Sequence, residues 1–395
     1  MRRSLMFIVF TFVLPAHAAD TLREAVERAW ARQPAAQAQR TRGEEFTAKR
    51  DAAGAAFPEP PSFRIGNRND RLNRNDGARE WEAEIALPLW LPGEQARQNS
   101  IANAEQDQYD TSLTATKLKV AGEVRDTYWQ ARLAENELTL ARRKAQEAAV
   151  LAADVERRVK AGDLARVEFN QAQGAERLAR ATLIETEIKA FKAQQAFAVL
   201  TNMTALPAVE ENIAAAPSLG DHPLLVSLQR VVVTAQAKLS QASQSLRNNP
   251  EIEFGVRRER NAFDDPYANS LQMRLRIPFA TDARNKPRIA AANAELIEAQ
   301  ATYGVEHTRV AAEIEAARRE LEQARIVAKL SEARFALAAD TQLLLAKAFA
   351  MGELDLVTRL RAENERFESE LNFTRAKLDA ARAISRLNQA LGVLP

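Results

Sequence analysis

The chain has no cysteine and only three histidines among its 395 residues. Disulfides and thiolate ligands are therefore excluded, and little material is left for a zinc, haem or thiol site. Glycine and proline are also scarce, at 13 and 15 residues, and 46% of the residues are hydrophobic, so collagen-like and disordered chains are excluded as well. The remainder is rich in Ala, Glu, Gln, Arg and Leu, a composition typical of long helices. We expect no cofactor, no metal site and no metalloenzyme.

An excess of positive charge is absent too. The formal net charge is +2, and both extra positive charges are Arg2 and Arg3. Without these two arginines the basic and acidic residues are equal in number, so the basic surface that nucleic-acid binding requires is missing.

The first residues predict a cleavable signal peptide at 1–18. A positive start precedes an apolar stretch from Leu5 to Leu14, and Ala16-His17-Ala18 forms an A-x-A cleavage site. The stretch is too short to cross a bilayer as a helix, which takes ~20 residues. No hydrophobic run of that length follows. The exported chain is then a soluble periplasmic protein, a secreted protein or an outer-membrane β-barrel protein.

The sequence repeats itself at an offset of 190 residues. Residues 102–105 (ANAE) recur at 292–295, and Gly162-Asp163-Leu164 has its counterpart in Gly352-Glu353-Leu354. Such matches at one offset predict a duplicated unit. We expect a first repeat at 19–204, a joint at 205–221 and a second repeat at 222–395.

Each repeat contains two segments in which apolar and polar residues alternate, the period-2 pattern of strands. The predicted strands are 62–70, 79–88, 250–258 and 270–279. One hairpin of this kind can be half-buried in a soluble protein. Four strands whose apolar faces are free of charge favour a membrane instead, because charge facing lipid costs ~2–4 kcal/mol at the bilayer midplane. The residues expected to face water inside a barrel are Arg64, Glu80, Glu82, Glu84, Glu251, Glu253, Arg257, Gln272, Arg274 and Arg276.

Four strands cannot close a barrel, and an open sheet edge in lipid leaves backbone groups unpaired. The barrel must therefore be shared between copies. Two copies would give an eight-stranded barrel, and side chains fill the interior of a barrel of that size. The density of charge on the polar faces favours twelve strands from three copies, with an open lumen.

The rest of each repeat is predicted to be helical. Opening helices are expected near 21–55 and 223–247, and long helices at 94–160, 163–202, 288–339 and 354–391. The glycines Gly162 and Gly352 separate the long helices in each repeat. Because a helix rises ~1.5 Å per residue, sixty residues span ~90 Å. We therefore expect a mainly α protein with long coiled-coil hairpins and a membrane β-barrel portion.

With these features in place, the sequence resembles the TolC-type outer-membrane efflux family over nearly all of the mature chain. The residues that carry the resemblance are the opening Thr21-Leu22-Arg23-Glu24-Ala25-Val26 with Gln33-Pro34, the two strand hairpins with Leu87-Pro88-Leu89, the segment Gly352-Glu353-Leu354-Asp355-Leu356-Val357, and Leu387-Asn388-Gln389-Ala390-Leu391-Gly392. The resemblance implies a homotrimer with a twelve-stranded barrel in outer-membrane lipid and a periplasmic α-helical tunnel. It further implies a non-enzymatic exit duct that docks on a periplasmic adaptor (membrane fusion) protein and an inner-membrane pump.

Within the family, the tip and C-terminal residues resemble the cobalt-zinc-cadmium branch, which resistance-nodulation-division pumps serve. This implies heavy-metal cations as cargo. Only His222 and His307 remain after cleavage, so metal selection would occur in the pump. Ducts of the same fold also serve multidrug efflux and type I secretion.

The family narrows its tunnel near the helix tips, commonly with acidic rings. The matching positions are Thr358 and Arg361, with Asp355 the nearest acid, and these three are the candidate constriction; alternatively, the charges are solvated tip residues. The candidate adaptor-facing tip residues are Gly162, Asp163, Arg166, Gly352 and Glu353.

A different class remains open, a periplasmic coiled-coil adaptor or structural protein. An adaptor would carry lipoyl-like and barrel segments rich in Val, Gly and Pro, which the sequence lacks. An enzyme is the poorest fit, because no nucleophile or glycine-rich phosphate loop stands out.

Overall fold

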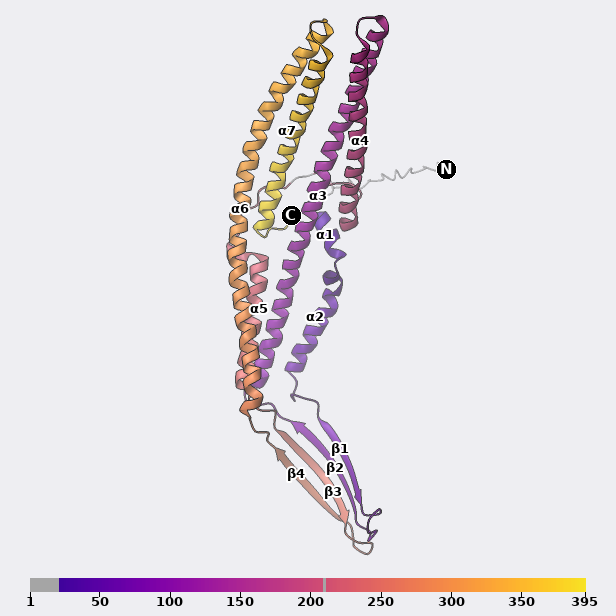
Figure 1. Cartoon of the computed structure of the whole chain (residues 1–395). Helices are drawn as coiled ribbons and strands as arrows, with labels where there is room; N and C mark the ends of the chain where they lie inside the picture. The colour runs from indigo at the N-terminus through magenta and orange to yellow at the C-terminus, as the bar shows by residue number, and fades with distance from the viewer. Residues whose placement is uncertain (1–20, 209–210) are drawn as a thin grey trace, which may run out of the picture. The chain divides into compact units, whose positions relative to one another are not determined.

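A computed structural model describes residues 21–208 and 211–395, so the predicted signal peptide at 1–18 lies outside the described residues. The protein is mostly helical, with one small antiparallel sheet (Figure 1). The elements are α1 (Leu22–Ala31), α2 (Pro34–Ala53), β1 (Ser62–Asn69), β2 (Arg79–Pro88), α3 (Glu94–Ala161), α4 (Arg166–Thr201), the 3₁₀ helix η1 (Leu219–Asp221), α5 (Pro223–Gln244), β3 (Glu251–Arg260), β4 (Ala268–Arg276), α6 (Asp282–Ala350) and α7 (Leu356–Ala390). The order helix, two strands, two long helices occurs twice along the chain.

The elements pack into two compact units, and each unit draws on both halves of the sequence. The helical unit combines the chain up to Arg32 with Leu118–Ala216 and Glu313–Pro395. The sheet unit combines Gln33–Lys117 with Pro217–Ala312. The sequence repeat therefore describes the succession of elements, whereas packing groups first-half elements with second-half elements.

Several elements differ in extent from the prediction. Helix α6 was predicted at 288–339 but runs from Asp282 to Ala350. The prediction was wrong at both ends; the helix accommodates Pro287 near its start, where a proline removes few backbone hydrogen bonds. Strand β4, predicted to reach residue 279, ends at Arg276, since Pro278 has no N–H to extend the ladder.

The predicted opening helix at 21–55 is interrupted. It forms two helices, α1 and α2, because Pro34 occupies the first turn of a new helix after the extended residue Gln33. The Thr21 hydroxyl caps α1 by accepting a hydrogen bond from the Glu24 N–H at 3.3 Å.

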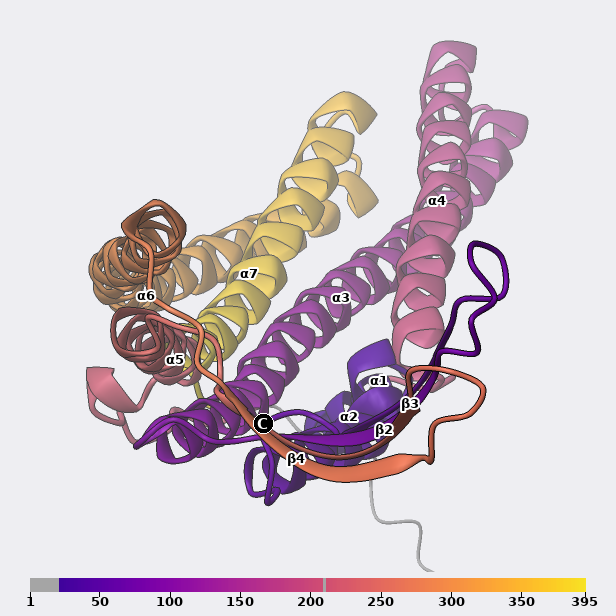
Figure 2. The same cartoon turned by 90° about the horizontal axis from the view of Figure 1, so that it is seen from below.

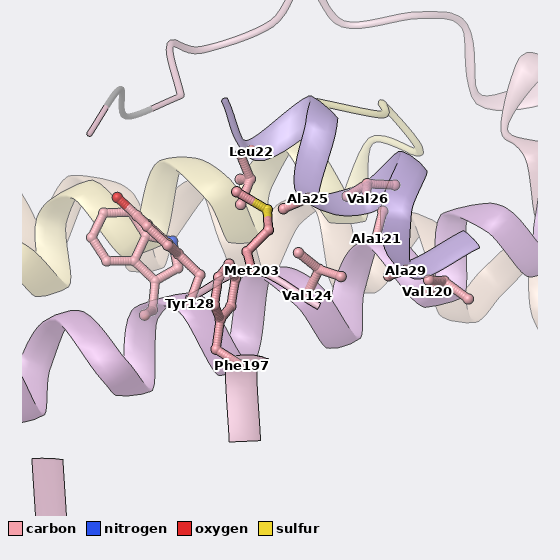
Figure 3. Packing of buried hydrophobic residues seen from close by; sticks show 11 residues of the cluster. Leu22, Ala25, Val26, Ala29, Val120, Ala121, Val124, Tyr128, Phe197 and Met203 are labelled. Atoms are coloured by element: carbon pink, nitrogen blue, oxygen red, sulfur yellow. The ribbon is translucent and has the colours of Figure 1, made fainter. Parts of the chain in front are cut away.

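The core of the helical unit lies where α1 packs against α3 and α4 (Figure 3). Small side chains of α1, among them Ala25 and Ala29, lie in one buried cluster with Val124 of α3. Beside them the Tyr128 ring meets the Phe197 ring of α4 with centroids 6.3 Å apart. The neighbouring Trp129 is bonded to α7, because its indole Nε1 donates to the Ser385 hydroxyl at 2.9 Å.

A buried arginine ties the predicted joint at 205–221 to this core. Arg125 of α3 is 3% exposed and forms an ion pair with Glu211 at 2.7 Å. Its guanidinium also donates to the Val393 carbonyl at 2.9 Å. One α3 side chain thus holds both the joint and the C-terminal residues of the helical unit.

The two predicted hairpins join into one four-stranded sheet with the order β1-β2-β3-β4, antiparallel throughout. The link is the β2–β3 pairing, in which Glu82 lies opposite Arg257 and Ile85 opposite Phe254. Figure 2 shows the strands side by side in a curved sheet. Among the described residues β1 and β4 have a partner on one side only.

Candidate functional site

The pairing register places all ten residues predicted to face a barrel lumen on one face of the sheet. Residues directly opposite one another in adjacent strands share a face. Arg64 lies opposite Glu84, and Glu253 lies opposite Arg274. The other members are every second residue along the same strands, so their side chains share this face. We call this the polar face; its predicted members are Arg64, Glu80, Glu82, Glu84, Glu251, Glu253, Arg257, Gln272, Arg274 and Arg276.

Ion pairs between strands compensate the charges of the polar face. Arg274 is central: it contacts Glu82 at 2.7 Å and Glu253 at 3.8 Å, and it also pairs with Glu84. Glu84 and Glu253 are only 4% and 8% exposed because arginine side chains cover them. The remaining cross-strand pairs are Arg64 with Glu84 (3.3 Å), Arg257 with Glu80 (2.9 Å) and Arg276 with Glu251 (3.6 Å).

The opposite face, the apolar face, has its large side chains in the open. Phe63, Leu271 and Met273 are 67%, 87% and 70% exposed. The register arranges the apolar residues in three rows: Leu87, Ile252 and Leu275; then Phe63, Ile85, Phe254 and Met273; then Ile65, Ala83, Val256 and Leu271. A continuous exposed apolar patch of this kind marks a surface that another apolar phase or partner covers.

The prediction that the apolar face is free of charge was wrong at its loop end. Beyond the third apolar row the register places Trp81 opposite Arg258, and then Arg79 opposite Arg260. Strand β3 continues to Arg260, two residues further than expected, because its pairing with β2 persists to Arg79. The three arginines therefore end the apolar rows beside the hairpin loops.

The tips of the two long hairpins in the helical unit have the same backbone design. Gly162 and Gly352 have φ angles of +88° and +80°, in the left-handed region that glycine adopts without strain. After each glycine the chain turns back: the Asp163 N–H donates to the Arg158 carbonyl at 2.9 Å and the Glu353 N–H to the Ala348 carbonyl at 3.0 Å. These are the bonds that close helix C-termini in Schellman motifs. Asp163, Glu353 and Arg166 are exposed at the tips.

A buried phenylalanine joins the two tips. Phe349 of α6 is 2% exposed and lies between two guanidinium groups, with Arg158 of α3 5.0 Å and Arg359 of α7 4.8 Å from its ring centre. It packs in one cluster with Val155 and Leu356. Arginine stacking on an aromatic face is favourable and leaves the charged group partly hydrated.

The three candidate constriction residues occupy different environments at the start of α7. Asp355 is the N-cap, and its carboxylate accepts a hydrogen bond from the Thr358 N–H at 3.4 Å. Thr358 is half-buried, whereas Arg361 is exposed and forms no ion pair with any described residue. The capping role of Asp355 was missed, although an aspartate directly before a helical stripe is a recognised N-cap signal.

Further along α7, ion pairs that the sequence did not reveal connect it to α3. Arg366 contacts Glu147 at 2.6 Å, and Arg143 pairs with Glu370, which is 9% exposed. Burial raises the pKa of Glu363 above its ordinary value, in spite of Arg359 at 3.2 Å. The ion pairs between α7 and α3 could not be predicted from the sequence, because alternating charges along a helix ordinarily indicate a solvent-exposed surface.

Neither metal binding nor a helical membrane span is indicated within residues 21–208 and 211–395. In these ranges no group of three or more His, Cys, Asp or Glu side chains could hold a metal ion. No helix there combines the length and the apolar character needed to cross a membrane.

Several solved outer-membrane proteins have a similar fold, although no family model and no curated protein matches the chain in sequence. VceC from Vibrio cholerae has a TM-score of 0.77 at 15% identity, over 94% of this chain and 96% of VceC. The Campylobacter jejuni outer-membrane channel CmeC has a TM-score of 0.76 at 13% identity, over 95% and 86%. The open-state outer-membrane channel MtrE of Neisseria gonorrhoeae has a TM-score of 0.75 at 16% identity, over 94% and 89%. The chain has the TolC-like fold, which confirms the fold class predicted from the sequence.

Proposed function

We propose that the protein is an outer-membrane exit duct of a tripartite efflux system. The observation that carries the proposal is the four-stranded sheet, because its polar and apolar faces are completely separated over three rows. In this arrangement the apolar face contacts lipid, and the polar face, with Arg64, Glu84 and Arg274 among its members, lines a water-filled lumen. Three consecutive apolar rows exposed on one sheet face are unusual in a soluble monomeric protein.

Assembly as a homotrimer follows from the edges of the sheet. Strands β1 and β4 each leave one row of backbone N–H and C=O groups unpaired within the chain, and lipid cannot satisfy them. Pairing β1 of one copy with β4 of the next satisfies both edges and closes a ring. Eight strands leave no room for the ion pairs of the polar face, so twelve strands from three copies are favoured.

The helical unit supplies the periplasmic part of the duct. Its outer helices α4 and α6 expose apolar side chains, including Phe191 at 62% and Leu330 at 66%, which a neighbouring copy would cover. The exposed tip residues Asp163 and Glu353 are proposed to face a periplasmic adaptor protein, together with Gly162, Arg166 and Gly352.

The tunnel constriction is proposed to lie at the start of α7. Asp355 and Arg361 are both exposed there, and three copies would form a basic or a salt-bridged ring. Thr358 would contribute its half-buried hydroxyl to the same level.

The cargo is proposed to be heavy-metal cations, delivered by a resistance-nodulation-division pump of the cobalt-zinc-cadmium type. The support is the resemblance of the tip and C-terminal residues to that branch. The described residues offer no metal-ligand group, so the duct would conduct passively and the pump would select.

Four measurements test the proposal. The protein should require detergent for extraction, have three times the chain mass by light scattering, and form ion-conducting pores in planar bilayers. A monomer that is soluble without detergent would instead favour the adaptor or structural alternative. Deletion of the gene should then raise sensitivity to a panel of metal salts; sensitivity only to drugs, or loss of a secreted protein, would reassign the cargo.

A further inference from the structure

The arginines at the loop end of the apolar face lack counter-charges. Arg79 and Arg260 lie directly opposite one another in neighbouring strands, a like-charge pairing that destabilises a sheet. No ion pair is formed by Arg79 or Arg258 with any residue that the structure describes. Arg258 lies over the Tyr267 ring at 4.4 Å, and Arg260 donates to the Gly77 carbonyl at 3.1 Å. An anion placed between these side chains would relieve the repulsion.

A hollow of about 420 Å³ lies on the same face, and Arg258 is the one of these arginines that lines it. Its floor is the small side chain of Ala83, and larger apolar side chains stand around it because the neighbouring positions hold branched or aromatic residues. The residues of the apolar face that line it are Ile65, Trp81, Ala83, Val256, Arg258, Asn269 and Leu271. The volume lies within the range of ~300–1,000 Å³ typical of ligand pockets. The hollow is thus largely apolar, and Arg258 is its basic residue on this face, with Arg79 one step further along β2 beyond Trp81.

We propose that this hollow and the arginines Arg79 and Arg258 bind a phosphorylated, acylated lipid of the outer leaflet. The inference rests on the proposed function, in which the long helices are periplasmic and the hairpin loops therefore face outward. An acyl chain would lie over Ala83 between Trp81 and Leu271. The phosphate would meet the guanidinium groups, which bind phosphate through paired N–H donors.

Charge and position together favour a lipid over other occupants. Successive residues on one face of a strand are ~7 Å apart, so Arg79 and Arg258 stand one or two steps beyond the last apolar row. This places positive charge where the headgroups begin if the apolar rows match the hydrocarbon region. A free anion would use the arginines but leave the hollow unfilled, and a neutral lipid would use the hollow but not the arginines.

The test uses the full mature protein in an uncharged detergent and three probes. These are bisphosphorylated lipid A, the same lipid without its phosphates, and inorganic phosphate. Binding is measured by native mass spectrometry and by the fluorescence change of Trp81, with Trp81→Phe identifying the signal of the other tryptophans. The double variant Arg79→Gln/Arg258→Gln removes two of the three positive charges at the loop end and leaves Arg260, which donates to the Gly77 carbonyl. The control is Arg68→Gln, since Arg68 lies at the same end of the sheet on the polar face, opposite Glu80.

Lipid A should bind the double variant at least tenfold more weakly than the wild type, and Arg68→Gln should leave binding unchanged. Ala83→Phe, which fills the hollow, should weaken the binding of both acylated lipids. Unaltered lipid A binding by the double variant would overturn the proposal, as would an equal loss in Arg68→Gln or equal affinity for inorganic phosphate. A trimer that conducts ions but binds no lipid A contradicts this inference alone, whereas a detergent-free monomer contradicts the proposed function.

Discussion

Replacing Met273 by arginine tests directly whether the apolar face of the sheet contacts lipid. Met273 lies in the middle apolar row, opposite Phe254, and is 70% exposed in the single chain. The matched control is Gln272→Arg, one residue earlier on the same strand and on the polar face. The pairing of Gln272 with Gly255 brings its added charge near Glu253 and Arg257, and Gln272 Oε1 accepts a hydrogen bond from Arg274 at 3.1 Å, so the control loses this bond but keeps the added charge in water.

The two environments give very different magnitudes. A surface substitution in water usually changes the free energy of unfolding by less than ~0.5 kcal/mol. An arginine facing lipid at the bilayer midplane costs ~2–4 kcal/mol. At about 1.4 kcal/mol per factor of ten, this lowers the ratio of folded to unfolded chains roughly 30- to 700-fold per copy. If folding and trimer assembly are coupled, the three copies add their costs.

The assay is refolding from urea into lipid vesicles, followed by heat-modifiable migration on gels and by trimer yield. Met273→Arg should shift the urea midpoint strongly to lower concentration, and Gln272→Arg should stay near the wild type. Equal midpoints for Met273→Arg and the wild type would refute the lipid-facing assignment. So would a larger loss in the Gln272 variant.

Three further predictions concern stability, each measured by thermal or urea unfolding of the purified protein. Gly352→Ala should lower the free energy of unfolding by ~1–2 kcal/mol, because the φ of +80° is unfavourable for any side chain. The control Gly304→Ala, inside α6, should leave it unchanged or raise it by up to ~1 kcal/mol. Equal effects of the two substitutions would contradict the backbone argument. Arg125→Met should cost ~3–5 kcal/mol because it leaves Glu211 buried without its partner, and the double variant with Glu211→Gln should recover part of that loss. Burial raises the pKa of Glu363 above its ordinary 4.5, so its proton stabilises the folded state at low pH and this contribution is lost as the pH rises through the raised pKa. Glu363→Gln should therefore gain stability relative to the wild type from pH 4.5 to neutral pH, and a constant difference would argue against the burial of that carboxylate.

Much of the sheet could be predicted because strand periodicity is local. The alternation of Glu80, Glu82 and Glu84 with apolar neighbours assigned both faces of β2 before any pairing was known. The loop end was not predictable in the same way. Only Arg260 was out of reach, because β3 keeps pairing with β2 as far as Arg79 and pairing length depends on a distant segment; Arg79 and Arg258 already shared the alternation of the apolar residues within the predicted strands.

At the helix tips, too, the local feature was predictable from the sequence and the contact between distant residues was not. Gly162 and Gly352 were identified from sequence because a lone glycine between two helical stripes has one common use, the left-handed C-terminal turn. The position of Phe349 between Arg158 and Arg359 was not identified, since those three residues come from three helices. An aromatic residue on an alanine-rich stripe predicts packing but not the partner.

By itself the sequence determined the kinds of elements, their order and the division of each strand into two faces, because these depend on the spacing of residues along a short stretch. Only the tertiary structure decided how the two hairpins join, which charges are buried and how far β3 extends beyond its predicted end. Arg125 shows the physical reason. A charged residue on a long helix is expected to be solvated, but the buried Arg125 is stabilised by Glu211, Gln389 and the Val393 carbonyl, groups that folding brings together from far along the chain.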